Sequence, residues 1–105
     1  SYPKERKEML KFTHDDRDYE LKMTRAGVSD AEAQGLTTSM ISEKPFMAAN
    51  LLFFAALARY KVSPRKAANI LDDLLDRGEV EFKDLYEELS TAYVELFGLG
   101  ESEKE

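Results

Sequence analysis

The sequence predicts an α+β fold that is mostly α, with an N-terminal β-hairpin packed on a bundle of about four helices. Apolar and polar residues alternate along 9–23, as in strands with one buried face. Apolar residues recur at helical spacing along 64–77 and 81–97. Residues 46–60 form the most apolar stretch and are rich in Ala, Leu and Met, so they favour a helix.

The composition indicates one domain with a solvated, acidic surface. The chain has 105 residues, enough for one modest core. It has no cysteine, which excludes disulfides, thiol nucleophiles and Cys-ligated zinc. Its net charge of -6 opposes binding to nucleic acid and anionic membranes. We expect a flexible arm over 1–8 without a signal-peptide core, a globular domain over 9–98 and a charged tail over 99–105.

The hairpin is expected over 9–23, with a polar turn from His14 to Asp18. A lone hairpin is marginal in water, so its apolar face should lie on helices. Asp16 and Asp18 have the Asp-x-Asp spacing of a calcium loop, but the glycine and closing glutamate of such a loop are missing. We therefore interpret the segment as a solvated turn, and His14 as a turn residue rather than a metal ligand.

The first helix is expected over 24–34. Thr24 is a suitable N-cap, although the capping-box spacing from Ser29 to Glu32 leaves a later start open. Gly27 counts against the earlier start because glycine weakens a helix by about 1 kcal/mol. A loop rich in Ser and Thr should follow, anchored to the core by Met40 and Ile41.

Three further helices are expected, over 45–60, 64–77 and 81–97. The first begins with a proline in its first turn. Its apolar stretch, residues 46–60, would span about 22 Å, less than the roughly 30 Å hydrocarbon layer of a membrane, so it should be a core helix. The second has the clearest start of all, with Ser63 as N-cap and Pro64 at the first position.

The central helix has more apolar faces than a domain of this size easily buries. One row along it is therefore the candidate partner-binding face: Phe46, Asn50, Phe53, Leu57 and Tyr60. A second row would pack in the core: Met47, Leu51, Phe54 and Ala58. The alternative is that the hairpin and the last two helices bury both rows. Tyr86 and Tyr93 are interpreted as aromatic residues at the edge of the core.

The sequence shows no catalytic constellation. A nucleophile needs an adjacent base, and the single histidine lies in the expected turn. Asp72, Asp73 and Asp76 could suggest metal or acid–base chemistry, but a solvated helix face is the simpler interpretation. We therefore expect a protein that is not an enzyme and binds no cofactor or metal.

The order of short motifs resembles the tail assembly chaperones of long-tailed phages and prophages, notably those of Gram-positive hosts. Residues 19–25, Tyr-Glu-Leu-Lys-Met-Thr-Arg, resemble the family's Tyr-x-Leu-x-Phe-Thr-Arg, with Met23 in place of Phe. Residues 32–36 resemble Glu-x-x-Gly-Phe, and residues 89–93 resemble Leu-x-x-x-Tyr. Each match is short, and each is a structural motif rather than a catalytic one.

The resemblance covers roughly residues 10–97, with one departure. Many members have Gly-Ala-Phe and then two histidines where this chain has Ala55-Ala56-Leu57 and then Arg59-Tyr60. The resemblance implies a protein of the host cytoplasm, absent from the mature virion. Such a chaperone binds the tape measure protein and helps recruit tail-tube subunits. A homo-oligomer and a longer frameshifted product are both compatible with it.

A small helical DNA-binding or regulatory protein is the alternative. Residues 60–66, Tyr-Lys-Val-Ser-Pro-Arg-Lys, place basic side chains at a helix start. The net negative charge and the Asp-rich continuation of that helix oppose this function.

Overall fold

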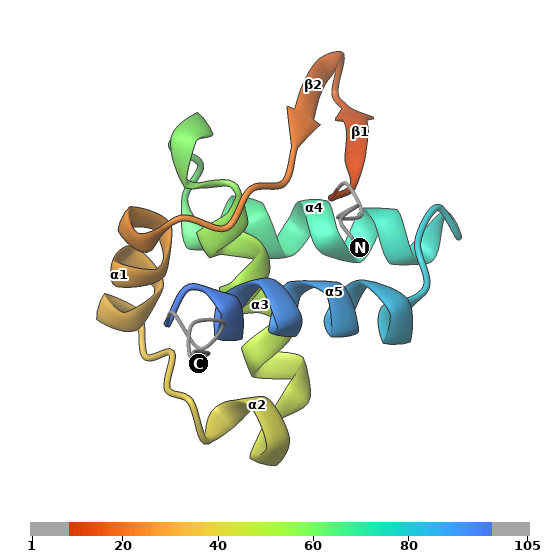
Figure 1. Cartoon of the computed structure of the whole chain (residues 1–105). Coiled ribbons are helices and arrows are strands. Elements are labelled where there is room, and N and C mark those ends of the chain that lie inside the picture. The colour runs from red at the N-terminus through yellow and green to blue at the C-terminus, as the bar shows by residue number, and fades with distance from the viewer. Residues whose placement is uncertain (1–8, 98–105) are drawn as a thin grey trace, which may run out of the picture.

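The structure, a computed structural model, describes residues 9–97 (Figure 1). Its elements follow in the order β1 (Lys11–His14), β2 (Arg17–Glu20), α1 (Arg25–Ala33), α2 (Met40–Glu43), α3 (Pro45–Ala56), η2 (Ala58–Tyr60), α4 (Pro64–Asp76) and α5 (Phe82–Glu95). η2 is a single 3-10 turn. The predicted fold class is confirmed: the domain is mostly α, with an antiparallel N-terminal hairpin. The predicted arm and tail lie outside the described residues.

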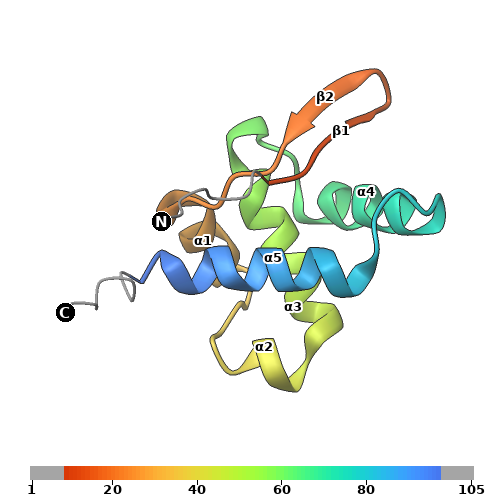
Figure 2. The ribbon, with the colours of Figure 1, turned by 45° about the vertical axis from the view of Figure 1, so that its right-hand side comes forward.

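The centre of the domain is α3. It contacts α1, α2, α4 and α5. In both views of the ribbon α5 crosses α3, and the hairpin projects beyond α4 (Figures 1 and 2). The core is therefore built around one short helix, as the apolar composition of residues 46–60 predicted.

The hairpin is tighter than predicted. Its turn consists of Asp15 and Asp16 alone, both at positive φ, 51° and 63°, which matches the right-handed twist of the two strands. His14 and Asp18 belong to the strands, so the predicted five-residue turn is too long. The register pairs Phe12 with Tyr19, and their rings stack with centroids 5.2 Å apart.

Helix α1 begins after Thr24, whose hydroxyl accepts a hydrogen bond from the Gly27 N–H at 3.0 Å. The later start at Ser29 is therefore wrong. Gly27 has a role that the helix propensity scale does not show. A Cβ at this position would lie 2.2 Å from the carbonyl oxygen of Ala55. The glycine thus lets α1 approach α3 at backbone distance.

The segment between α1 and α3 is not entirely a loop, because residues 40–43 form α2. Met40 and Ile41 pack against the core, as predicted. This short helix lies at the end of α3 far from the hairpin (Figure 1).

The central helix ends at Ala56, earlier than the predicted residue 60. The carbonyl of Ala56 accepts a hydrogen bond from the Lys22 N–H at 3.0 Å. The Tyr60 N–H, which would reach that carbonyl in a continued helix, donates to Leu57 instead. The chain therefore tightens into η2 and turns at Lys61, which has a left-handed φ of 57°.

Helix α4 begins as predicted, with Ser63 accepting a hydrogen bond from the Lys66 N–H at 3.0 Å. Its apolar stripe is buried and consists of Ala67, Ile70, Leu71 and Leu74. The chain leaves α4 through Gly78 at a φ of 74°. Helix α5 covers 82–95, slightly less than the predicted 81–97.

Candidate protein-binding surface

The predicted partner-binding row does not lie on one surface. Phe46 is 72% exposed, and Asn50 is exposed one turn later. Phe53 and Leu57 are both 0% exposed, so placing them on a partner face is wrong. The hairpin covers this part of the helix, since the Phe12 ring stacks on Phe53 with centroids 6.0 Å apart.

Tyr60, the last residue of that row, is half-buried and holds the hairpin. Its hydroxyl accepts a hydrogen bond from the Glu20 N–H at 2.9 Å, and its ring packs edge-on against Tyr19 at 4.9 Å. Arg59 donates to the Glu20 carbonyl at 2.8 Å. These contacts use Tyr60 for internal packing rather than for a partner.

The second row divides at the same place. Met47 is 53% exposed and Leu51 is half-buried, whereas Phe54 is buried. The first half of α3 therefore has one exposed side, formed by Phe46, Met47 and Asn50, and one buried side, formed by Ala48 and Ala49, whereas its second half is buried all round. Neither of the two predicted arrangements, one row exposed or both rows buried, describes α3.

The exposed end of α3 joins α5 in a cluster of three aromatic rings. Phe46 lies 4.9 Å from Phe82 between ring centroids, and Phe82 stacks on Tyr86 at 5.4 Å. Phe82 and Tyr86 are half-buried. We call Phe46, Phe82 and Tyr86 the aromatic patch; Met47 is the next residue after Phe46. Isolated exposed apolar residues are normal on protein surfaces, but a contiguous apolar patch is typical of an interaction site.

The patch is held in place from one side by α2. The Tyr86 hydroxyl donates to the carbonyl of Ile41 at 2.5 Å. Burial raises the pKa of Tyr86 above the ordinary value of 10.0. The neutral phenol is therefore the form that the fold favours, and it fixes one ring of the patch.

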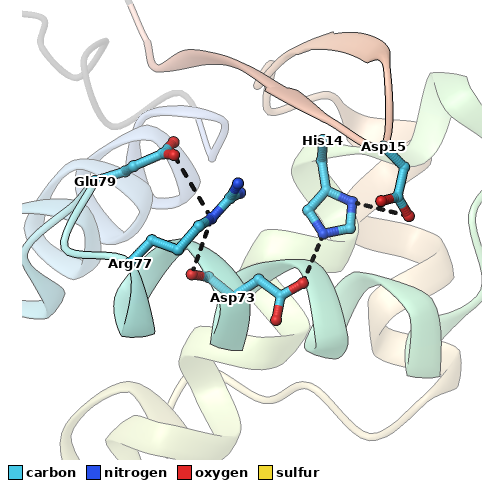
Figure 3. Close-up of polar contacts among 5 residues, drawn as sticks. All are labelled: His14, Asp15, Asp73, Arg77 and Glu79. Carbon is cyan, nitrogen blue, oxygen red and sulfur yellow. Dashed lines mark hydrogen bonds and ion pairs between the residues drawn. The ribbon is translucent and has the colours of Figure 1, made fainter.

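A second polar feature joins the hairpin to α4 (Figure 3). The buried His14 ring places Nε2 at 2.8 Å from Asp73 and Nδ1 at 3.6 Å from Asp15. Arg77 donates from Nε to the Asp73 carbonyl and pairs with Glu79 at 3.5 Å. His14 is thus not the solvated turn residue that we predicted. Asp73 lies on a solvated helix face, but its carboxylate also contacts the hairpin through His14.

The His14–Asp73 contact is a structural clamp. A carboxylate beside an imidazole can orient a catalytic base, but then the other ring nitrogen must face a nucleophile. Here Nε2 faces the Asp73 carboxylate at 2.8 Å. Nδ1 is buried without a hydrogen-bond partner among the described residues, and the charged group paired with it is the Asp15 carboxylate at 3.6 Å. The contact joins residues far apart in the sequence, so no local signal could have predicted it.

Within residues 9–97 no three or more His, Cys, Asp or Glu side chains are grouped so that they could bind a metal ion. Nor does any helix in this range have the length and apolar character needed to cross a membrane.

The structure thus defines a small α+β domain that carries an aromatic patch on α3 and α5. Residues 6–105 match the model of a family described as a domain of unknown function, DUF5055, and the chain belongs to this family. No curated protein and no solved structure matches the chain.

Proposed function

We propose that this chain is a phage tail assembly chaperone that binds the tape measure protein through the aromatic patch and helps recruit tail-tube subunits. It would act in the host cytoplasm without enzymatic activity and be absent from the mature virion. The motif order along residues 10–97 supports the family. The observation that carries the binding surface is the 72% exposure of Phe46 within a cluster of three rings.

The patch suits a long helical client. An amphipathic helix binds another protein by laying its apolar face on an apolar surface. Covering one exposed Phe side chain is worth on the order of 2 kcal/mol, and aromatic residues often dominate such interfaces. The net charge of -6 would help to keep the complex soluble.

The residues that carry the resemblance have structural roles. Tyr19 and Leu21 are buried, Thr24 caps α1, and Gly35 has a positive φ of 112°. Tyr93 is buried and bonds to Thr38 through its hydroxyl at 3.2 Å. The motifs therefore support a shared fold, while the binding proposal rests on the patch.

Co-purification is the first test. The chain would be co-expressed with the longest coiled-coil protein encoded just downstream in its genome, and the pair run on a sizing column. We expect co-elution, with the client insoluble when expressed alone. The same column run with the chain alone reports whether the chain self-associates.

A matched pair of variants locates the surface. Phe46→Ser should abolish co-elution, whereas Phe97→Ser, which changes another exposed Phe outside the patch, should not. A client that precipitates whether or not the chain is present contradicts the proposed function. Equal loss of binding in both variants contradicts the proposed surface.

DNA binding remains the rival proposal. Arg65 and Lys66 are exposed in the first turn of α4, but Asp72 and Asp76 are exposed on the same helix. A shift of duplex DNA that weakens steeply with salt, together with no binding to the client, would favour the regulatory function over the chaperone.

A further inference from the structure

A groove of about 830 Å³ runs along α5. Residues at the beginning of the described chain and in the link between α4 and α5 form its other walls. With about 100° between successive residues of a helix, Asp84, Glu88 and Glu95 project from the side of α5 opposite Tyr86. The groove and the aromatic patch therefore lie on opposite flanks of this helix.

The groove combines apolar and acidic lining. Its apolar part is contributed by Met9, Leu10, Val80, Leu85 and Ala92. Six carboxylates also line it: Glu79, Glu81, Asp84, Glu87, Glu88 and Glu95. Among the described residues that line the groove there is no lysine or arginine.

These six carboxylates, of the 21 acidic residues in the chain, lie along one side of α5 and in the link before it. Within residues 9–97, Glu79 is the one of the six that is paired with a cation, the neighbouring Arg77. Asp84 and Glu88 are four residues apart on the helix, a spacing at which like charges destabilise a helix. A cationic ligand would remove this repulsion, so the free groove is electrostatically complementary to a basic partner.

The charge and the apolar character of the lining also favour some classes of partner over others. Nucleic acid and anionic membranes are repelled by the carboxylates, and a second copy of this chain would bring its own net charge of -6. Apolar walls suit an apolar helix face rather than a free polyamine. The distance from Asp84 to Glu95 is about 16 Å at 1.5 Å per residue, the length of about three helical turns.

We infer that this groove docks a basic amphipathic helix of a partner protein, with lysine or arginine side chains reaching the carboxylates and an apolar face against Leu10, Leu85 and Ala92. The inference does not depend on the proposed function. It concerns another surface and any partner that carries such a segment.

The test uses the full chain and a synthetic probe. The probe is a fluorescent 18-residue amphipathic helix of Leu and Lys; its control has every Lys replaced by Glu. We expect the anisotropy of the Lys probe to rise on binding at low salt, and the affinity to fall as salt screens the charges. The Glu control should not bind.

Two double variants with the same charge change show where binding occurs. Asp84→Asn with Glu88→Gln should weaken binding about tenfold or more, whereas Asp72→Asn with Asp76→Asn on α4 should change it less than about twofold. Circular dichroism of each variant checks the fold. Equal weakening by both pairs, or no binding of the Lys probe to the wild-type chain, overturns the inference.

An NMR titration of the wild-type chain with the Lys probe gives an independent result. Amide shifts around Leu10, Asp84, Glu88 and Ala92 support the groove; shifts centred on Phe46 and Tyr86 overturn it. Failure of the groove would leave client co-elution sensitive to Phe46→Ser. Conversely, failure of the proposed function would leave probe binding in the groove intact, so the two failures are distinguishable.

Discussion

The two halves of α3 are both apolar, but only the first half has an exposed side. The first half buries Ala48 and Ala49 and exposes Phe46 and Met47, whereas residues 52–56 are all buried. The second half meets α1 at backbone distance through Gly27 and is covered by the hairpin. The Phe46 ring in the first half contacts Phe82 of α5. Most of Phe46 nevertheless stays in solvent. Composition therefore makes a helix suitable for burial, but its neighbours decide which part of it is buried.

The largest expected effect is in the buried half. Phe53→Ala should reduce the free energy of unfolding by about 3–5 kcal/mol, because it removes a fully buried ring and leaves a cavity. Since small domains have only about 5–15 kcal/mol in total, the variant should be close to unfolding. Urea denaturation followed by circular dichroism measures the loss. A loss below about 1 kcal/mol would show that the second half of α3 is not the buried half.

The next effect concerns the close approach of α1 to α3. Gly27→Ala should cost about 1–3 kcal/mol, because the new Cβ would overlap the Ala55 carbonyl oxygen and the two helices would have to separate. In an exposed helix the same change is stabilising by about 1 kcal/mol. The sign of the change in the urea midpoint therefore decides whether the backbone contact exists.

At the exposed half, Tyr86→Phe should cost about 1 kcal/mol at neutral pH through the lost hydrogen bond to Ile41. It should also change the alkaline limb of the stability curve. The pKa of Tyr86 is raised in the folded chain, so its contribution is complete below pH 10 and falls as the pH rises further. The wild-type chain should therefore lose more stability than the variant above pH 10. If the free energy of unfolding of the two proteins depended on pH in the same way, the raised pKa of Tyr86 would be contradicted.

The smallest effect on stability is expected for Phe46→Ser, below about 0.5 kcal/mol, because the ring is mostly in solvent. The same variant should have the largest effect on client binding. Thermal denaturation and the co-purification assay, run on the same preparation, measure both. A large loss of stability would mean that Phe46 supports the core and is not available to a partner.

Most of the fold could be predicted because its signals are local. Ser63, Thr24 and the alternation around Tyr19 each specify a cap or a strand within a few residues. The end of α3 could not be predicted, because a hydrogen bond from Lys22 occupies the carbonyl of Ala56. The spacing of apolar residues along 45–60 gives no information about a contact with a residue so far away in the sequence.

The surface was predicted only in part, for a related reason. Helical periodicity separates faces around a helix, and it correctly marked Phe46 as a candidate for exposure. It does not separate the two ends of a helix, so it grouped Phe46 with the buried Phe53. The His14–Asp73 clamp and the pairing of Phe46 with α5 depend on tertiary packing, which the local sequence does not encode.

The bond from Lys22 to Ala56 also has a kinetic consequence. The segment that follows β2 supplies, through the Lys22 N–H, a hydrogen bond to the last residue of α3, so this bond forms only when the N-terminal segment has docked. The contacts of α3 with α4 are closer in sequence, and short loops close at lower entropic cost. We therefore expect α3 and α4 to associate first and the hairpin to dock late, as the step that closes the domain.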